Sequence, residues 1–120
     1  MNTKVAIPTR NGKVYEQFGH CDYFTIYSIE WGKIMREEYF KMPEDCENDT
    51  NVPFLLAQKD VKVVLAGKIG IDEAELLIFH GIKVFWNCSG NVKEIINKYL
   101  NSELSDLEWK DKGFCRISKS

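Results

Sequence analysis

A histidine and a cysteine stand side by side in the segment Phe18-Gly19-His20-Cys21. Imidazole and thiolate groups are the side chains that best suit soft transition metals and iron–sulfur species. Gly19 would allow the backbone to turn, or a ligand to approach it closely. Because neighbouring side chains on a loop can turn toward the same ligand, His20 and Cys21 are candidate metal ligands. The alternative is a histidine hydrogen-bonded to backbone beside a buried, neutral cysteine, and a lone His-Cys pair is a weak motif.

A second candidate is the turn Gly67-Lys68-Ile69-Gly70, which follows a hydrophobic run and precedes an expected helix. The free N–H groups at a helix N-terminus attract anions, and Lys68 lies nearby. The turn matches neither G-x-x-x-x-G-K-[ST] nor G-x-G-x-x-G, and Asp72 and Glu73 would repel a phosphate at close range. We interpret it either as a tight strand-to-helix turn or as a cradle for a bulkier cluster held partly by backbone amides.

The stretch from Pro43 to Asp49 holds four carboxylates and Cys46. It lacks the glycine and the spacing of an EF-hand, and its acids would raise the pKa of the thiol. We therefore expect a solvated loop there. The cysteines of the chain, at positions 21, 46, 88 and 115, form no C-x-x-C, so no zinc ribbon or thioredoxin-like dithiol is encoded locally.

These segments must be positioned by elements that the residue patterns predict. Runs rich in β-branched and aromatic residues predict strands, and apolar residues at helical spacing predict helices. Strands are expected over 4–8, 23–29, 33–40, 61–66 and 82–86, and helices over 53–59, 71–80 and 91–100. Trp31-Gly32 joins the second and third strands as a hairpin.

Three sequential antiparallel strands followed by α-β-α-β-α predict an α/β fold with one mixed five-stranded sheet. About three helices would cover its two faces, giving a three-layer, ribonuclease-H-like architecture. We expect this domain to span residues 1–104, followed by an irregular tail over residues 105–120.

Catalysis is not expected. A nuclease of the ribonuclease H type gathers carboxylates around two metals, beginning with an acid on its first strand, and Lys4-Val5-Ala6-Ile7 has none. As sequence neighbours, His20 and Cys21 are poorly placed to act as base and nucleophile. His80 is expected at a helix end, where it would interact with the helix dipole rather than act as a base.

The composition of the chain excludes further classes of function. The chain has 120 residues, 44% hydrophobic residues and a net charge of −2, so it can bury a core, and it lacks the basic balance of a nucleic-acid binder. No apolar run approaches the length of a membrane span, and because residues 1–4 lead straight into a strand-like run we expect no leader peptide. We expect a cytoplasmic protein that acts on neither nucleic acid nor membrane.

Five segments in order carry a resemblance to a known family: 5–9 (VAIPT), 18–24 (FGHCDYF), 61–70 (VKVVLAGKIG), 81–84 (GIKV) and 89–92 (SGNV). Together they make the chain, over about residues 4 to 104, resemble the dinitrogenase iron–molybdenum cofactor biosynthesis family. The resemblance implies a domain of ribonuclease-H-like fold without the catalytic acids. It also implies a carrier or chaperone, related to nitrogen fixation, that holds the nitrogenase cofactor or its cluster precursors.

The family pattern differs from this chain at one position. In cofactor-binding members of the family a histidine commonly precedes the Phe-Gly pair, and Gln17 stands there in this chain. An amide is a poor ligand for a soft iron–sulfur cluster. Under the resemblance, either His20 and Cys21 take over that role, or the protein binds something else or nothing.

The sequence therefore predicts non-catalytic binding or carriage of an iron–sulfur or iron–molybdenum cluster, or its precursor, exchanged with donor or acceptor proteins. The predicted metal ligands are His20 and Cys21. The predicted binding residues are Phe18, Gly19, His20, Cys21, Gly67, Lys68 and Gly70. The alternative is a protein-interaction or regulatory domain without a cluster, which would dock a partner through exposed aromatics and the acidic loop. A third hypothesis is an enzyme that acts on phosphorylated substrates.

Overall fold

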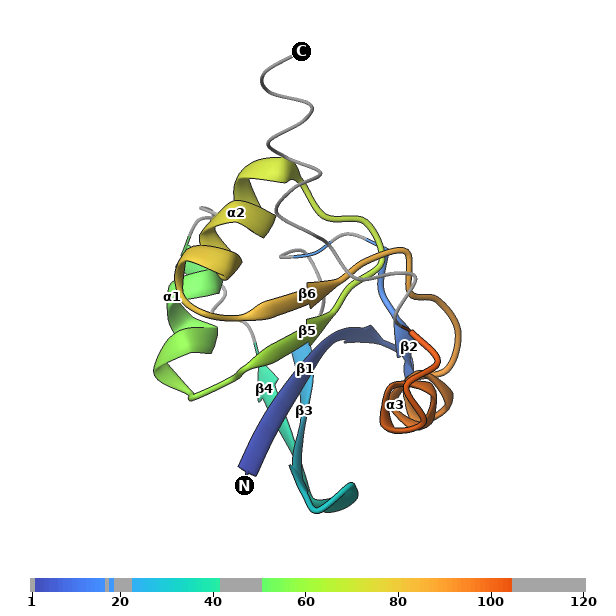
Figure 1. Ribbon diagram of the computed structural model, residues 1–120. Helices are drawn as coiled ribbons and strands as arrows, with labels where there is room; N and C mark the ends of the chain where they lie inside the picture. The colour runs from blue at the N-terminus through green and yellow to red at the C-terminus, as the bar shows by residue number, and fades with distance from the viewer. Residues whose placement is uncertain (1, 17, 19–22, 42–50, 105–120) are drawn as a thin grey trace.

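The computed structural model describes residues 2–16, 18, 23–41 and 51–104. These residues form one mixed sheet and three helices (Figure 1). The strands are β1 (Asn2–Arg10), β2 (Lys13–Val14), β3 (Tyr23–Glu30), β4 (Lys33–Lys41), β5 (Val63–Leu65) and β6 (Lys83–Phe85). The helices are α1 (Asn51–Gln58), α2 (Ile71–Phe79) and α3 (Val92–Leu100).

Strand β1 lies at the centre of the sheet, whose order is β4-β3-β1-β5-β6. It pairs antiparallel with β3 along most of its length and parallel with β5 at Val5 and Ala6. Because neighbouring strands and packed helices surround it, the side chains of residues 5–7 are fully buried. This continuous burial explains why the run reads as apolar without alternation.

Strand β1 continues beyond the proline at which the predicted strand ended. The carbonyl of Pro8 accepts a hydrogen bond from the Tyr15 N–H (2.9 Å), on the side of β1 that also pairs with β5 and β2. Since the nitrogen and the carbonyl of a strand residue face the same side, the missing N–H of Pro8 leaves the ladder to β3 intact. The predicted end at Pro8 was wrong for this reason.

The short strand β2 was also not predicted. The Asn11-Gly12 turn, with φ of 54° and 77°, folds it back against the end of β1. Positive φ at both central residues is the geometry of a tight hairpin turn. The sheet therefore has six strands rather than the expected five.

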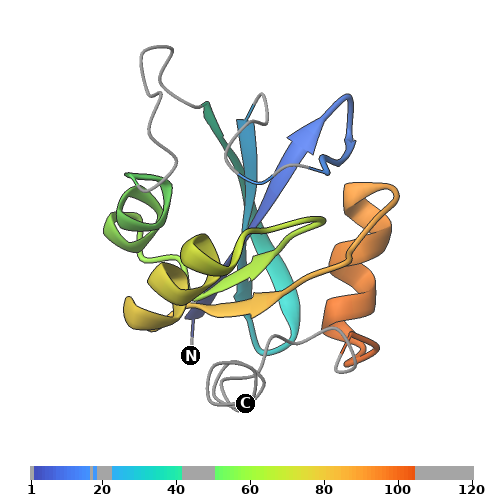
Figure 2. The same ribbon diagram turned by 90° about the horizontal axis from the view of Figure 1, so that it is seen from above.

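Helices cover both faces of the sheet, as predicted. Figure 2 shows α1 and α2 on one side and α3 on the other. Alternate residues along β1 supply the two cores: Ala6 packs with the residues beneath α1 and α2, whereas Val5 and Ile7 pack with those beneath α3. The mixed α/β architecture is confirmed, while the ribonuclease-H-like label stays a prediction.

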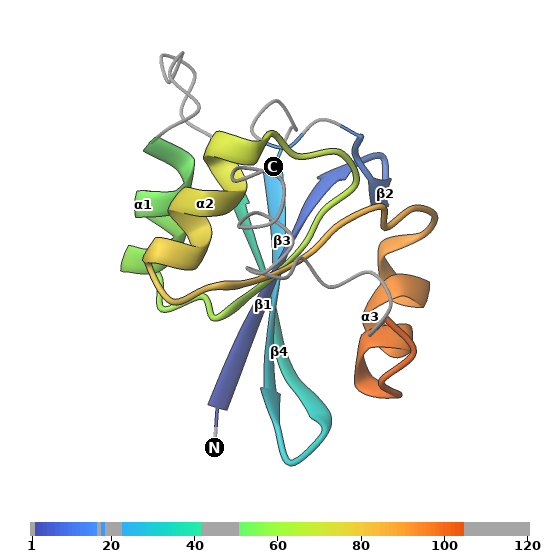
Figure 3. The same ribbon diagram turned by 45° about the horizontal axis from the view of Figure 1, so that its top comes forward.

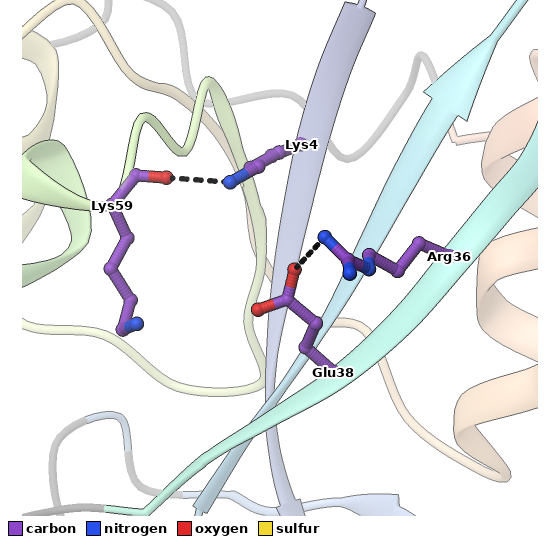
Figure 4. A network of polar contacts seen from close by, with 4 residues as sticks. All are labelled: Lys4, Arg36, Glu38 and Lys59. Carbon is purple, nitrogen blue, oxygen red and sulfur yellow. Dashed lines mark hydrogen bonds and ion pairs between the residues drawn. The ribbon is translucent and has the colours of Figure 1, made fainter.

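The predicted hairpin at Trp31-Gly32 is confirmed, with positive φ at both residues. Its second strand, β4, forms an edge of the sheet and exposes most of its side chains. On β4, Arg36 lies 3.8 Å from the Glu38 carboxylate, and on β1 the Lys4 ammonium donates to the Lys59 carbonyl (3.2 Å; Figure 4). Charged side chains along β4, such as Arg36 and Glu38, discourage pairing of this edge with another strand.

Other predicted bounds shift by one or two residues. Helix α1 begins at Asn51, two residues before the predicted start, and β5 and β6 are each shorter than their apolar runs. The expected domain end at 104 is untested, and the expected tail over 105–120 lies outside the described residues. In the described part of the chain, no helix is long and apolar enough to cross a membrane.

The packing of α3 gives a first testable prediction. Ile96 is buried between α3 and the sheet, whereas Lys98 on the same helix is exposed. Replacing Ile96 with Ala should lower the free energy of unfolding by about 2–5 kcal/mol, through lost burial and a residual cavity. Lys98→Ala is the matched control and should change it by less than about 0.5 kcal/mol in chemical denaturation. Equal losses in the two variants would contradict the packing of α3 described above.

Candidate functional site

The candidate site lies at the edge of the sheet where β1, β5 and β6 end. These three strands run parallel, so the turns that follow β5 and β6 emerge at the same edge. Figure 3 shows these turns at the same end of the sheet as β2. The two segments singled out in the sequence, which lie almost fifty residues apart, meet here.

Backbone hydrogen bonds join the two segments directly. The Lys68 N–H donates to the Glu16 carbonyl (2.7 Å), and the Phe18 N–H donates to the Lys68 carbonyl (3.2 Å). This reciprocal pattern extends strand-like pairing beyond the end of β5. Of the predicted site residues, Phe18 and Lys68 are thus held next to each other by their backbones.

A third segment, which the sequence reasoning missed, lies on the other side of the turn. The Asn87 N–H donates to the Gly67 carbonyl (2.7 Å), and the Cys88 N–H donates to the Ala66 carbonyl (2.9 Å). Asn87 has a positive φ of 63°, which asparagine tolerates better than most residues. The polar composition of residues 87–90 predicts a turn, but it does not indicate which other segment that turn contacts.

Gly67 is required by the close approach of the chain to itself. A Cβ added at Gly67 would lie 3.2 Å from the Glu16 Cα and 3.2 Å from the Tyr15 carbonyl oxygen. Both neighbours are backbone atoms, which cannot rotate away. In this structure the space above Gly67 is therefore filled by residues 15 and 16.

Gly70 has a different role from Gly67. It caps the N-terminus of α2 with an extended backbone (φ −71°), and a Cβ there would meet only the flexible Glu73 carboxylate at 3.5 Å. The Gly70 N–H donates to that carboxylate (3.3 Å), and Asp72 lies in the same first turn. The protein's own acids thus occupy the N-terminus of α2, which argues against a phosphate there.

Phe18 belongs to the hydrophobic core. Its side chain is 2% exposed, and its ring meets the Phe24 ring edge-on at 5.5 Å. Packing of this kind anchors the start of the segment that continues into Gly19, His20 and Cys21. Those three residues lie outside the described residues, as do Gln17, Cys46 and Cys115, so their placement stays a prediction. Lys68 is exposed at the surface beside this anchor.

Cys88 lies beneath the same edge but is not poised as a metal ligand. Its side chain is 3% exposed, and burial raises the pKa of the thiol to about 12. The thiol donates a weak hydrogen bond to the Trp86 carbonyl (3.9 Å). Cys88 is therefore a packing residue of the core beneath α3.

The second histidine lies away from this edge, just after α2. His80 is exposed, and its ring lies edge-on to that of Phe79 and tilted to that of Phe54, with centroids 5.5 Å and 6.3 Å away. Across the described part of the chain, no three His, Cys, Asp or Glu side chains gather closely enough to hold a metal ion.

The contrast between the two glycines gives a second prediction. Gly67→Ala should lower the free energy of unfolding by about 1–3 kcal/mol, because the new methyl group would press on the backbone of residues 15 and 16. Gly70→Ala is the matched control and should cost less than about 1 kcal/mol, since only a flexible side chain must move. Denaturant titration measures both, and equal stabilities for the two variants would contradict the close approach at Gly67.

The buried thiol gives a third prediction. Its folded-state pKa of about 12 exceeds the ordinary value of 9.0, so the unfolded chain loses this proton first as the pH rises. The stabilising contribution is complete below pH 9 and is lost as the pH rises through 12. The free energy of unfolding should be measured between pH 8 and about 11. It should fall less steeply with rising pH in Cys88→Ala than in wild type, because the variant has no thiol to titrate. Identical slopes would show that the thiol is not buried in this way.

Comparisons with known proteins agree with this architecture. An uncharacterized protein of Methanocaldococcus jannaschii is 26% identical over 110 residues, which are 88% of this chain and 92% of that protein. The apo form of the orange protein of Desulfovibrio gigas has the same fold, with a TM-score of 0.74 at 20% identity over 90% of this chain and 97% of that one. A crystal structure from Methanocaldococcus jannaschii, provisionally named a dinitrogenase, also gives 0.74 at 20% identity, over 92% and 97% of the two chains.

The family comparison covers most of the sequence. The family model described as dinitrogenase iron-molybdenum cofactor matches residues 1–102, which include every described strand and helix. The family predicted from five short segments is therefore confirmed. The chain belongs to the dinitrogenase iron–molybdenum cofactor family.

Proposed function

We propose that this protein is a non-catalytic carrier that binds an iron–sulfur or iron–molybdenum cluster, or a precursor of one, at the edge of the sheet formed by residues 16–21, 66–70 and 85–88. The observation that carries the proposal is the pair of hydrogen bonds between Phe18, Lys68 and Glu16 within a chain of this family. They fix the backbone at the start of the segment that contains His20 and Cys21.

The chemistry of the available donors suits a cargo more than a resident cofactor. His20 and Cys21 offer one imidazole and one thiolate, ligands that suit soft metals. Two protein ligands would leave most positions on a cluster open to sulfide or to a partner's groups. Such a cluster can be passed on, whereas four cysteine ligands would retain it.

Charge at this edge supports the same proposal. Lys68 is exposed on the strip that pairs with Phe18, and its ammonium group would attract an anionic, sulfide-rich cluster. The hydrogen bond from the Gly70 N–H leaves the Glu73 carboxylate charged, so the acids in the first turn of α2 weaken this attraction. The neighbouring Cys88 is buried, with 3% exposure, and is not among the proposed ligands.

The relatives support cargo binding only in general terms. The family is described by the iron–molybdenum cofactor, and the orange protein structure is named an apo form, the term for a protein without its bound group. A catalytic role has less support, because the side chains of residues 5–7 on the central strand are buried and apolar. We propose a cytoplasmic carrier whose partners donate or accept the cluster.

A protein-interaction domain without a cluster is the second candidate function. Phe79 is 81% exposed and Phe54 is 50% exposed, and the His80 ring contacts both. Exposed aromatic rings grouped in this way are common at protein interfaces. In this alternative, the pair of helices α1 and α2 would form the docking face.

Anaerobic reconstitution of the full chain with iron and sulfide, with and without molybdate, tests the proposal. We expect a charge-transfer chromophore and bound metal in wild type. Cys21→Ala and His20→Ala should lose most of both, because each removes a proposed ligand. Cys46→Ala is the matched control, since it removes a thiol from the acidic loop and should keep the full chromophore.

Each other outcome has a defined meaning. Absence of a chromophore in folded wild-type protein would overturn the carrier proposal and favour the interaction domain. A full chromophore in Cys21→Ala would remove the ligand assignment. Circular dichroism of each variant separates loss of binding from loss of folding.

A further inference from the structure

A cavity of about 300 Å³ opens on the α3 side of the sheet, between β3, β4 and the N-terminus of α3. Gly67 and Lys68 do not line it, so it is separate from the strip described above. Its lining combines aromatic, hydroxyl and carboxylate groups: Thr9, Tyr23, Thr25, Tyr27, Glu37 and Tyr39 from the sheet. At its rim lie Gly12, Asn91, Val92 and Lys93.

Two of the three tyrosine hydroxyls in this cavity, those of Tyr27 and Tyr39, donate their protons to Glu37. The Tyr39 hydroxyl donates to the Glu37 carboxylate (2.8 Å), and the Tyr27 hydroxyl donates to the same carboxylate at 3.5 Å. Burial and the neighbouring Glu37 charge raise the pKa of Tyr27 to about 12, so its proton stays in place. Both phenol oxygens therefore have only lone pairs left to offer a ligand.

The hydroxyl protons of the two buried threonines are also donated within the protein. The Thr9 hydroxyl donates to the Ile7 carbonyl (2.7 Å) and lies 2.8 Å from the Thr25 hydroxyl. Since Thr9 has used its one proton, Thr25 must donate to Thr9. The Thr25 oxygen is left as an acceptor, and both side chains are at most 2% exposed.

The N-terminus of α3 adds few free donors. The Val92 N–H donates to the Gly12 carbonyl (3.0 Å), and the Lys93 N–H donates to the Asn91 side chain (2.9 Å). An anion entering the cavity would therefore find these two amides occupied and the Glu37 carboxylate repelling it. Lys93 is the cation among the lining residues, and its side chain is exposed.

From this set of acceptors we infer that the cavity is a binding site for a protonated amine or a guanidinium group. The Glu37 carboxylate would accept one N–H of the cation, and the Thr25 oxygen another. The Tyr23 and Tyr39 rings, edge-on at 5.4 Å, supply aromatic surface beside the charge. The cation could come from a small amine or from a lysine or arginine of another protein.

Nuclear magnetic resonance titration of the full chain, without a cluster, tests the site. Butylammonium should shift the signals of the cavity residues, while butyrate should not. Tetramethylammonium, which lacks N–H groups, should bind at least about tenfold more weakly, because it cannot donate to the carboxylate or the threonine. Binding of butyrate, or equal binding of tetramethylammonium, would overturn the proposal.

Two variants and a matched control test whether the Glu37 carboxylate binds the cation. Glu37→Gln keeps the shape and the acceptor for Tyr39 but removes the charge, and should weaken butylammonium binding at least about tenfold. Glu38→Gln removes the same charge from the next residue, which pairs across from Ile26 on the other face of the sheet, and should have little effect (Figure 4). Lys93→Ala should strengthen binding by removing repulsion. An unchanged affinity in Glu37→Gln, or equal losses in the two Gln variants, would overturn the site.

A further comparison distinguishes the two sources of the cation. An acetylated and amidated Gly-Lys-Gly peptide presents the same ammonium group within a backbone. Tighter binding of the peptide than of butylammonium would identify a basic side chain of a partner protein, and weaker binding would identify a free amine. A failure of both ligands to bind would overturn the proposal and leave the carrier function untouched, since that function uses different residues.

Discussion

The missing side chain of Gly67 is the constraint on which the candidate site depends. Three stretches of backbone lie against one another there: residues 15, 16 and 18 on one side, the turn 66–68 in the middle and residues 85–88 on the other. A methyl group on Gly67 would stand 3.2 Å from the backbone of residues 15 and 16. Only glycine lets the middle stretch hydrogen-bond to both neighbours and so fixes the start of the segment that carries His20 and Cys21.

The alternation of side chains along the sheet separates two surfaces with different chemistry. Residues such as Ala6 and Ile26 face α1 and α2, while Val5 and Tyr27 face α3. Because α3 covers only part of its face, a cavity remains beside it, with the exposed Tyr39 ring at its mouth and the buried Thr9, Thr25 and Tyr27 in its lining. We propose that the backbone-lined edge at Gly67 holds a cluster and that the separate, acceptor-lined cavity on the α3 face holds a cation.

Local patterns predicted the elements of this fold, because they depend on neighbouring residues. Three local patterns each identify an element without information from the rest of the chain: the apolar run 61–66, the Trp31-Gly32 turn and the amphipathic face of α3. Contacts between distant segments could not be predicted in this way. Tertiary packing alone determines three features of the structure. They are the pairing of Asn87 with Gly67, the continuation of β1 past Pro8, and the direction of the hydrogen bonds made by the Thr9 and Thr25 hydroxyls. His20 and Cys21 lie outside the described residues, so their role remains a sequence prediction.

The location of the cargo is the central claim, and amide spectra of the protein before and after anaerobic reconstitution test it most directly. If the cluster binds at the proposed edge, the signals of Gly67, Lys68 and Asn87 should shift or broaden. Signals of the hairpin tip at Trp31 and Gly32, at the opposite end of the sheet, should stay unchanged. Changes centred on the hairpin tip, or metal uptake without any change near Gly67, would contradict the account.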